Sequence, residues 1–133
     1  MIGLVIATHA RLAEELVTAT AMIIGPSDRV CAVAVRQGSG VEEIRLELAG
    51  AIDNVNPDDD GVIIMTDMFG GTPSNISLSF FDPERIEVIT GINLPMVLKF
   101  FNSPADLSVA ELARLLKAYG QQSITLASEF LAS

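Results

Sequence analysis

Short runs of apolar residues recur along the chain and predict four strands, at Ile2–Ala7, Val30–Val35, Gly61–Thr66 and Arg85–Thr90. The first three runs are apolar at successive positions rather than at alternate ones, which is typical of strands buried on both faces. The fourth run is more mixed in polarity. The pattern therefore indicates a sheet that other elements cover on both sides.

The segments between these runs carry apolar residues at the spacing of a helix. A helix over residues 10–24, ended by Gly25-Pro26, has one apolar face, formed by Leu12, Leu16, Ala19 and Ile23. The same reasoning predicts four more helices, over residues 41–52, from Pro73 onward, over residues 93–101 and over residues 108–118.

Residues with capping preferences mark the ends of the later helices. Thr72 is expected to cap the helix that starts at Pro73. Ser108 and Glu111 have the Ser-x-x-Glu spacing of a capping box, and Gly120 is expected to end the helix that they start. Residues 124–130 fit either a late strand or a terminal helix.

Alternating strands and helices predict one α/β domain over residues 1–133. We expect a three-layer α/β/α open sheet, mainly parallel, with strand order 2-1-3-4 and a flavodoxin-like topology. The chain shows no internal repeat and no linker, so nothing divides it further.

Composition narrows the classes of protein and of partner. Half of the 133 residues are hydrophobic and 19% are charged, which excludes a disordered chain. The net charge of −9 would repel a polyanion, so we expect no nucleic-acid partner. The chain has one cysteine, no signal peptide and no apolar run of about 18 residues, and we expect a cytoplasmic protein.

Two candidate residues come together at the predicted switch point of the sheet. With strand order 2-1-3-4, a ligand is expected at the carboxyl ends of the first and third strands. His9, the only histidine, follows the first strand and Asp67 follows the third. A carboxylate on one ring nitrogen would fix the tautomer and leave the other nitrogen as a nucleophile. In the structural alternatives, His9 caps a helix or fills a polar niche and Asp67 caps its own loop.

The segment Gly70-Gly71-Thr72-Pro73 leads into a helix start, where free amides and the helix dipole favour an anion. The hydroxyls of Thr8, Thr72 and Ser74 could add donors. Together with His9 and Asp67 this predicts a phosphohistidine, formed by nucleophilic catalysis. No Walker pattern is present, so we expect the phosphoryl group to come from another protein.

Other chemistries lack the residues that they need. Zinc sites use three or four ligands, and one histidine with one cysteine does not supply them, so we expect no metal and no cofactor. Gly38-Ser39-Gly40 lacks the Gly-x-Ser-x-Gly spacing of a hydrolase elbow and a second histidine. Cys31 is expected to be a small core residue.

Three segments that follow one another along the chain resemble the IIA component of the mannose-family sugar phosphotransferase system. They are Ile6–Leu16, Thr66–Asn75 and Gly91–Met96. With the element order, the likeness covers almost the whole chain and implies a single EIIA domain. It implies that the phosphocarrier HPr phosphorylates His9 on Nε2, with Asp67 orienting the ring. The phosphoryl group would pass to a histidine of a separate EIIB component, and the membrane components EIIC and EIID would be reached only indirectly.

The resemblance also implies an assembly and a docking face. Family members are homodimers that exchange a C-terminal strand, which would place an antiparallel edge strand at Ile124–Ala127. Phosphate binding is expected from Thr8, Gly70, Gly71 and Thr72. An apolar rim for HPr and EIIB is expected from five residues, Met68, Phe69, Leu94, Pro95 and Met96, which could equally pack the edge of the sheet.

Two other functions compete with a phosphohistidine carrier. A response-regulator receiver keeps its acceptor aspartate where Asp67 stands, although Thr8-His9 replaces the acidic pair that would hold Mg²⁺. A non-catalytic anion-binding adaptor would use the loop Gly70–Thr72 and leave His9 structural. A phosphocarrier subunit of dihydroxyacetone kinase is a close cousin, but Asp67–Thr72 looks more like the sugar-transport branch. The sugar, and the choice between transport and regulation, stay open.

Overall fold

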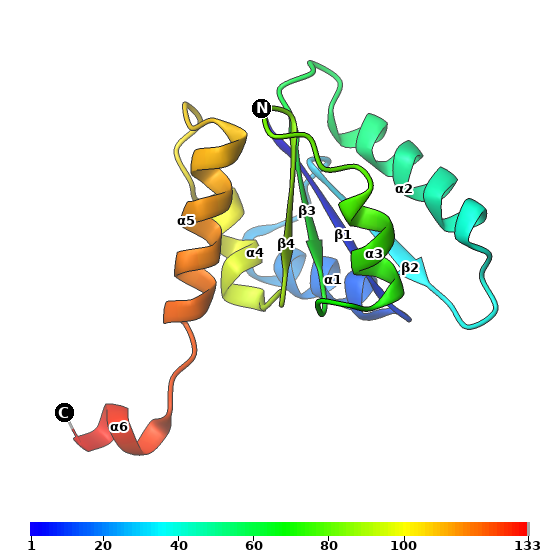
Figure 1. Ribbon diagram of the computed structural model, residues 1–133. Coiled ribbons are helices and arrows are strands. Elements are labelled where there is room, and N and C mark those ends of the chain that lie inside the picture. The colour runs from blue at the N-terminus through cyan, green and yellow to red at the C-terminus, as the bar shows by residue number, and fades with distance from the viewer. Residues whose placement is uncertain (133) are drawn as a thin grey trace.

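A computed structural model describes residues 1–132 and shows four strands and six helices within them (Figure 1). The strands are β1 (Gly3–His9), β2 (Val30–Val35), β3 (Val62–Thr66) and β4 (Ile86–Thr90). The helices are α1 (Leu12–Ile24), α2 (Val41–Val55), α3 (Thr72–Leu78), α4 (Leu94–Phe101), α5 (Val109–Gln122) and α6 (Ala127–Ala132).

The four strands form one parallel sheet in the order β2-β1-β3-β4, which confirms the expected fold class. The register pairs His9 with Val35, Ala7 with Thr66 and Thr66 with Thr90. The carboxyl ends of all four strands therefore meet at one edge, the lower one in Figure 1.

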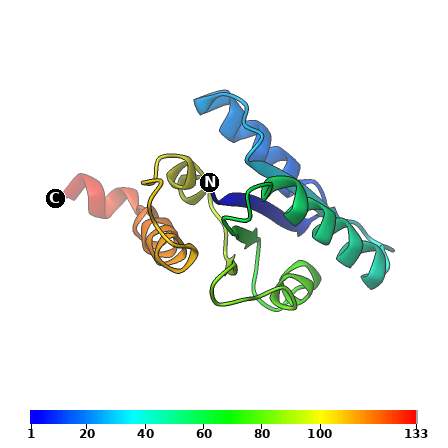
Figure 2. The same cartoon turned by 90° about the horizontal axis from the view of Figure 1, so that it is seen from above.

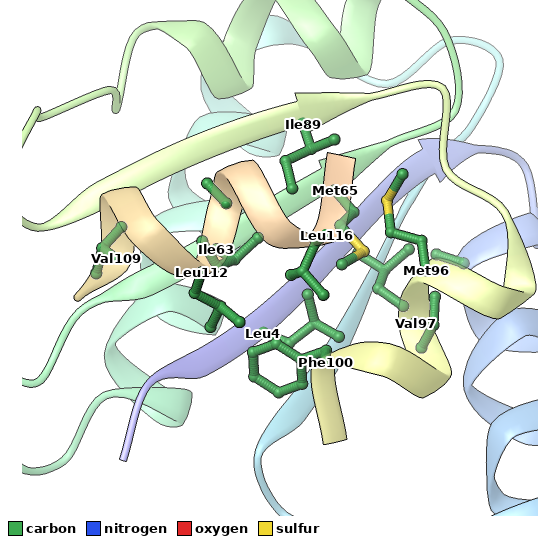
Figure 3. Close-up of a cluster of buried hydrophobic side chains, with 13 residues drawn as sticks. Leu4, Ile63, Met65, Ile89, Met96, Val97, Phe100, Val109, Leu112 and Leu116 are labelled. Atoms are coloured by element: carbon green, nitrogen blue, oxygen red, sulfur yellow. The ribbon is translucent and has the colours of Figure 1, made fainter. Parts of the chain in front are cut away.

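Helices cover both faces of the sheet and give it three layers (Figures 1 and 2). Side chains alternate between the faces of a strand, so Leu4 and Ile6 of β1 pack with α1, α4 and α5, whereas Val5 and Ala7 pack with α2 and α3. Figure 3 shows the first of these cores, where Met96 and Phe100 of α4 meet Leu116 of α5 over the sheet. Burial on both faces explains why the central strands β1 and β3 are apolar along most of their length.

Two helix ends differ from the sequence expectations. Gly71, not Thr72, is the N-cap of α3, and no side chain caps it. The helix α5 does not end at Gly120 but continues to Gln122, because Gly120 packs closely against the Met96 side chain of α4. The capping box of α5 is confirmed, since Ser108 accepts from the Glu111 amide and Glu111 accepts from the Ser108 amide.

The C-terminal edge strand expected at Ile124–Ala127 is wrong for the single chain. Residues 124–126 form no strand and α6 follows them, projecting away from the sheet (Figures 1 and 2). An extended segment is stable only when its amides find a neighbouring strand, and the chain here points away from any. Helix α6 instead satisfies its amides locally, as in the bond from Phe130 N to the Leu126 carbonyl.

None of the helices in residues 1–132 combines the length and the apolar character that crossing a membrane requires.

Candidate functional site

His9 and Asp67 lie in contact at the carboxyl edge of the sheet. His9 ends β1, and Asp67 follows β3, the strand paired with β1. The Nδ1 atom of His9 is 2.8 Å from Oδ2 of Asp67, across 58 positions of sequence. The His9 side chain is 48% exposed and that of Asp67 14% exposed, so the ring reaches solvent while the carboxylate lies largely behind it.

Asp67 is held as an anion. Its Oδ2 also accepts the His9 backbone amide at 3.0 Å, and its Oδ1 accepts the Met68 amide at 3.1 Å. Burial opposes ionisation, but the hydrogen bonds from the His9 ring and backbone outweigh it and lower the pKa of Asp67 below its ordinary value. A carboxylate beside Nδ1 favours the tautomer with hydrogen on Nδ1, which leaves the Nε2 lone pair free.

The glycine loop after β3 packs against the Cε1–Nε2 edge of the His9 ring. A Cβ atom on Gly71 would lie 2.7 Å from Cε1 and 3.2 Å from Nε2 of His9, so only glycine fits without moving the imidazole. Gly70 turns the loop with φ +89°, in the left-handed region that favours glycine. The loop backbone is therefore adjacent to Nε2, where a phosphoryl group would be attached.

The start of α3 completes this side of the site. Thr72 is the first helical residue and is exposed, and Pro73 follows it in the first turn. Amides in the first turn of a helix have no helical acceptor, and the positive end of the helix dipole lies there. The segment Gly70–Thr72 thus brings backbone donors and one hydroxyl to the His9 ring.

Thr8 does not face this site. Its side chain is fully buried, and its hydroxyl accepts the Ala13 amide at 2.7 Å and donates to the His9 carbonyl at 3.1 Å. Side chains of consecutive strand residues point to opposite faces, so Thr8 is directed toward the start of α1 while His9 is directed to the loop. The structure does not support the expected phosphate contact from Thr8 and gives its hydroxyl a capping role.

A cleft of about 450 Å³ opens beside His9 between the loop after β2 and the start of α3. Its lining adds Arg36 and Gln37, which the sequence reasoning missed, and Ser39, which it considered only as a hydrolase serine. The missed signal is positional: β2 is also a neighbour of β1, so residues directly after β2 reach the same edge of the sheet.

The expected apolar rim divides into exposed and buried members. Met68 and Phe69 are exposed, Phe69 at 74%, and both lie in the loop next to His9. Leu94 and Pro95 are half-buried. Met96 belongs to the core between α4 and α5, so its inclusion in an accessible rim is wrong; the first turn of α4 turns its side chain inward against Gly120.

In the described part of the chain, neither Cys31 nor a group of metal ligands adds a second site. Cys31 lies half-buried in β2, where burial first, and then the negative Glu47, raise the pKa of its thiol. Across residues 1–132, no group of three or more histidine, cysteine, aspartate and glutamate side chains is arranged to hold a metal ion.

Comparison with known proteins identifies the family. The EIIA-man family model, "PTS system fructose IIA component", matches residues 3–117. The PTS system fructose-specific EIIA component of Bacillus subtilis is 31% identical over 132 residues, 98% of this chain and 90% of that protein. The mannose-specific EIIAB component of Escherichia coli K12 is 29% identical over 125 residues, 92% of this chain and 38% of that longer protein.

Solved structures agree with the sequence comparisons. The mannose/sorbose specific IIA subunit of the phosphotransferase system from Enterococcus faecalis has a TM-score of 0.83 with this chain at 28% identity. The similarity covers 94% of this chain and 93% of that subunit. The chain therefore belongs to the EIIA-man family, the mannose-family EIIA components of the sugar phosphotransferase system.

Proposed function

We propose that this protein is a phosphocarrier that accepts a phosphoryl group from phospho-HPr on Nε2 of His9. It passes the group to a histidine of an EIIB component, as one step of sugar uptake or its regulation. The observation that carries this proposal is the 2.8 Å contact between His9 Nδ1 and the Asp67 carboxylate, which leaves Nε2 free beside the Gly71 backbone.

The proposed transfer exchanges one nitrogen–phosphorus bond for another. The Nε2 lone pair of His9 attacks phosphorus, and the bond to the donor histidine breaks with its electron pair staying on the donor nitrogen. The proton on Nδ1 stays in place, and Asp67 stabilises the positive charge that develops on the ring. Backbone amides of Gly70, Gly71 and Thr72 would hold the phosphoryl oxygens, so positioning and charge stabilisation carry the step.

The surroundings of His9 suit a protein partner. Phe69 and Met68 are exposed in the loop next to His9 and offer an apolar contact, with Leu94 and Pro95 half-buried at the start of α4. The net charge of −9 would steer a carrier that has a basic docking face. HPr and EIIB would use this face in turn, and EIIC and EIID would be reached only through EIIB, in the cytoplasm.

We also propose a homodimer built through the C-terminal segment. Ile124 and Leu126 are exposed where the chain leaves α5. β4 pairs with β3 on one side only and its other side faces a hollow of about 440 Å³, lined in part by residues 87–91 and Ile124. An exchanged segment from a second copy could pair with this open edge, as edge strands commonly do.

Labelling through the whole relay tests the proposed function. The protein is incubated with labelled phosphoenolpyruvate, enzyme I and HPr, and His9→Ala is compared with wild type. We expect an acid-labile, base-stable label on wild type and none on His9→Ala, with circular dichroism showing the same fold. A label that survives His9→Ala contradicts the proposal. If, in a separate reaction, acetyl phosphate and Mg²⁺ give a base-labile label that is lost in Asp67→Asn, the protein is a receiver instead.

A further inference from the structure

The group that the proposed function places on His9 is strongly anionic, since a phosphoryl group carries close to two negative charges. The loop after β3 offers it backbone amides and the Thr72 hydroxyl, which are neutral. Among the residues that line the cleft beside His9, one is a cation, Arg36. An anion on the cleft side of the ring would therefore meet a single charged partner.

The sheet fixes where Arg36 starts. His9 pairs with Val35 in the register of β1 and β2, and the amide of Ala10 donates to the Val35 carbonyl at 2.8 Å. Arg36 is the next residue after Val35, so its backbone lies beside the residues that follow β1. Both His9 and Arg36 line the cleft between them.

The present partner of Arg36 holds it weakly. Its Nη2 is 3.4 Å from Oε1 of Glu14, at the long limit of a hydrogen bond, and its side chain is 64% exposed. Exposed pairs of this kind contribute little. Glu14 also accepts from Nε of Arg11 at 3.1 Å, so its carboxylate stays paired when Arg36 leaves. Arg36 can therefore turn toward a new anion at small cost.

We propose that Arg36 binds the phosphoryl group on Nε2 of His9 and stabilises its charge during transfer, an inference that rests on the proposed function. The guanidinium group presents parallel N–H donors that match two phosphoryl oxygens. The contact forms hydrogen bonds only: Arg36 keeps its protons, and the nitrogen–phosphorus exchange is unchanged. In the unphosphorylated protein Arg36 rests on Glu14, and phosphorylation moves it to the new anion.

The test compares Arg36→Gln and Arg36→Lys with a matched control, Arg85→Gln. Arg85 also forms one exposed ion pair, with Asp59, but precedes β4 at the opposite edge of the sheet. With phospho-HPr as donor, we expect Arg36→Gln to lower kcat about tenfold, Arg36→Lys to restore part of the loss, and Arg85→Gln to match wild type. In ³¹P NMR titrations of the phosphorylated proteins, Arg36→Gln should raise the titration midpoint of the phosphoryl group by about one pH unit.

The outcomes separate this inference from the proposed function. If wild type takes up no label on His9, the proposed function fails. If His9 is labelled and Arg36→Gln keeps the wild-type kcat and ³¹P midpoint, the inference is overturned and the relay stands. A raised KM with unchanged kcat and midpoint also overturns it, because Arg36 would then contact the carrier rather than the phosphoryl group.

Discussion

The proposed nucleophile, Nε2 of His9, is positioned by groups that other segments supply. Oδ2 of Asp67 lies 2.8 Å from Nδ1 of the ring, and Gly71, which has no Cβ, leaves room for the Cε1–Nε2 edge. Because Asp67 binds the ring and the backbone amide of the same residue, the ring and the end of β1 are held together. The site is thus oriented before any partner arrives, which reduces the ordering that transfer requires.

The lowered pKa of Asp67 predicts a dependence of stability on pH. A carboxylate whose pKa falls on folding stabilises the protein above its unfolded pKa, about 3.9, and this contribution is lost as the pH falls through the lower folded value. We expect Asp67→Asn to reduce the free energy of unfolding by about 1–2 kcal/mol at about pH 5. The deficit relative to wild type should shrink toward about pH 2, measured by urea denaturation at each pH.

A neutralised carboxylate elsewhere controls for net charge. Asp58 is exposed in the turn before β3, so Asp58→Asn removes the same charge without touching the site. Its free energy of unfolding should differ little from that of wild type at either pH. An Asp67→Asn deficit that stays constant as the pH falls would show that the native contacts of the carboxylate do not depend on its charge.

For single residues, the sequence predicts which of them come close together but not how their side chains are oriented. His9 and Asp67 could be paired because parallel neighbouring strands end at one edge. The inward direction of Thr8 depends on the phase of β1 and on where α1 begins. The contact of Gly71 with the ring depends on the path of a short loop. Alternation along β1 places Thr8 and His9 on opposite faces, but residue spacing gives neither the face that meets the site nor the path of the loop. Arg36 was missed because it belongs to no motif.

Individual elements follow local rules where their hydrogen bonds are local. The capping box at Ser108 and Glu111 is a contact between residues three apart, so sequence alone predicts it. Gly120 is different, because the tendency of glycine to end a helix loses to the packing of α5 on α4. The C-terminal segment also departs from expectation, because a strand needs a partner that the single chain does not provide.

Two helical glycines provide a matched test of this packing. Alanine favours a helix over glycine by about 0.5–1 kcal/mol. A Cβ on Gly50 of α2 meets nothing within 4 Å, whereas one on Gly120 would lie 2.6 Å from Cε and 3.4 Å from Cβ of Met96. We expect Gly50→Ala to raise the free energy of unfolding by about 0.5–1 kcal/mol and Gly120→Ala to lower it by about 1 kcal/mol.

Urea denaturation of both variants measures the two changes. The Gly50→Ala variant is the control, since it carries the same substitution in a helix that leaves room for it. If Gly120→Ala raises the free energy of unfolding as much as Gly50→Ala does, the close packing of Gly120 against Met96 does not matter for stability.

For the molecule as a whole, the parallel α/β class follows from the alternation of elements, and the edge that carries the candidate site follows once the strand order 2-1-3-4 is taken. Parallel strands buried on both faces leave few other arrangements for four short apolar runs. The hydrophobic pattern does not predict whether copies of the chain assemble. The C-terminal segment carries apolar side chains that the single chain leaves exposed, among them Ile124 and Leu126, and the proposed homodimer would cover them.

Dimerisation through this segment predicts an effect of charge at its exposed positions. Ile124 and Leu126 are 78% and 61% exposed, and burying each against a second copy would contribute about 1.5–3 kcal/mol per side chain. We expect wild type to sediment as a dimer and the double variant Ile124→Asp/Leu126→Asp as a folded monomer. Leu46→Asp is the control, since Leu46 is 71% exposed on α2, and it should remain dimeric. A double variant that still dimerises places the interface elsewhere.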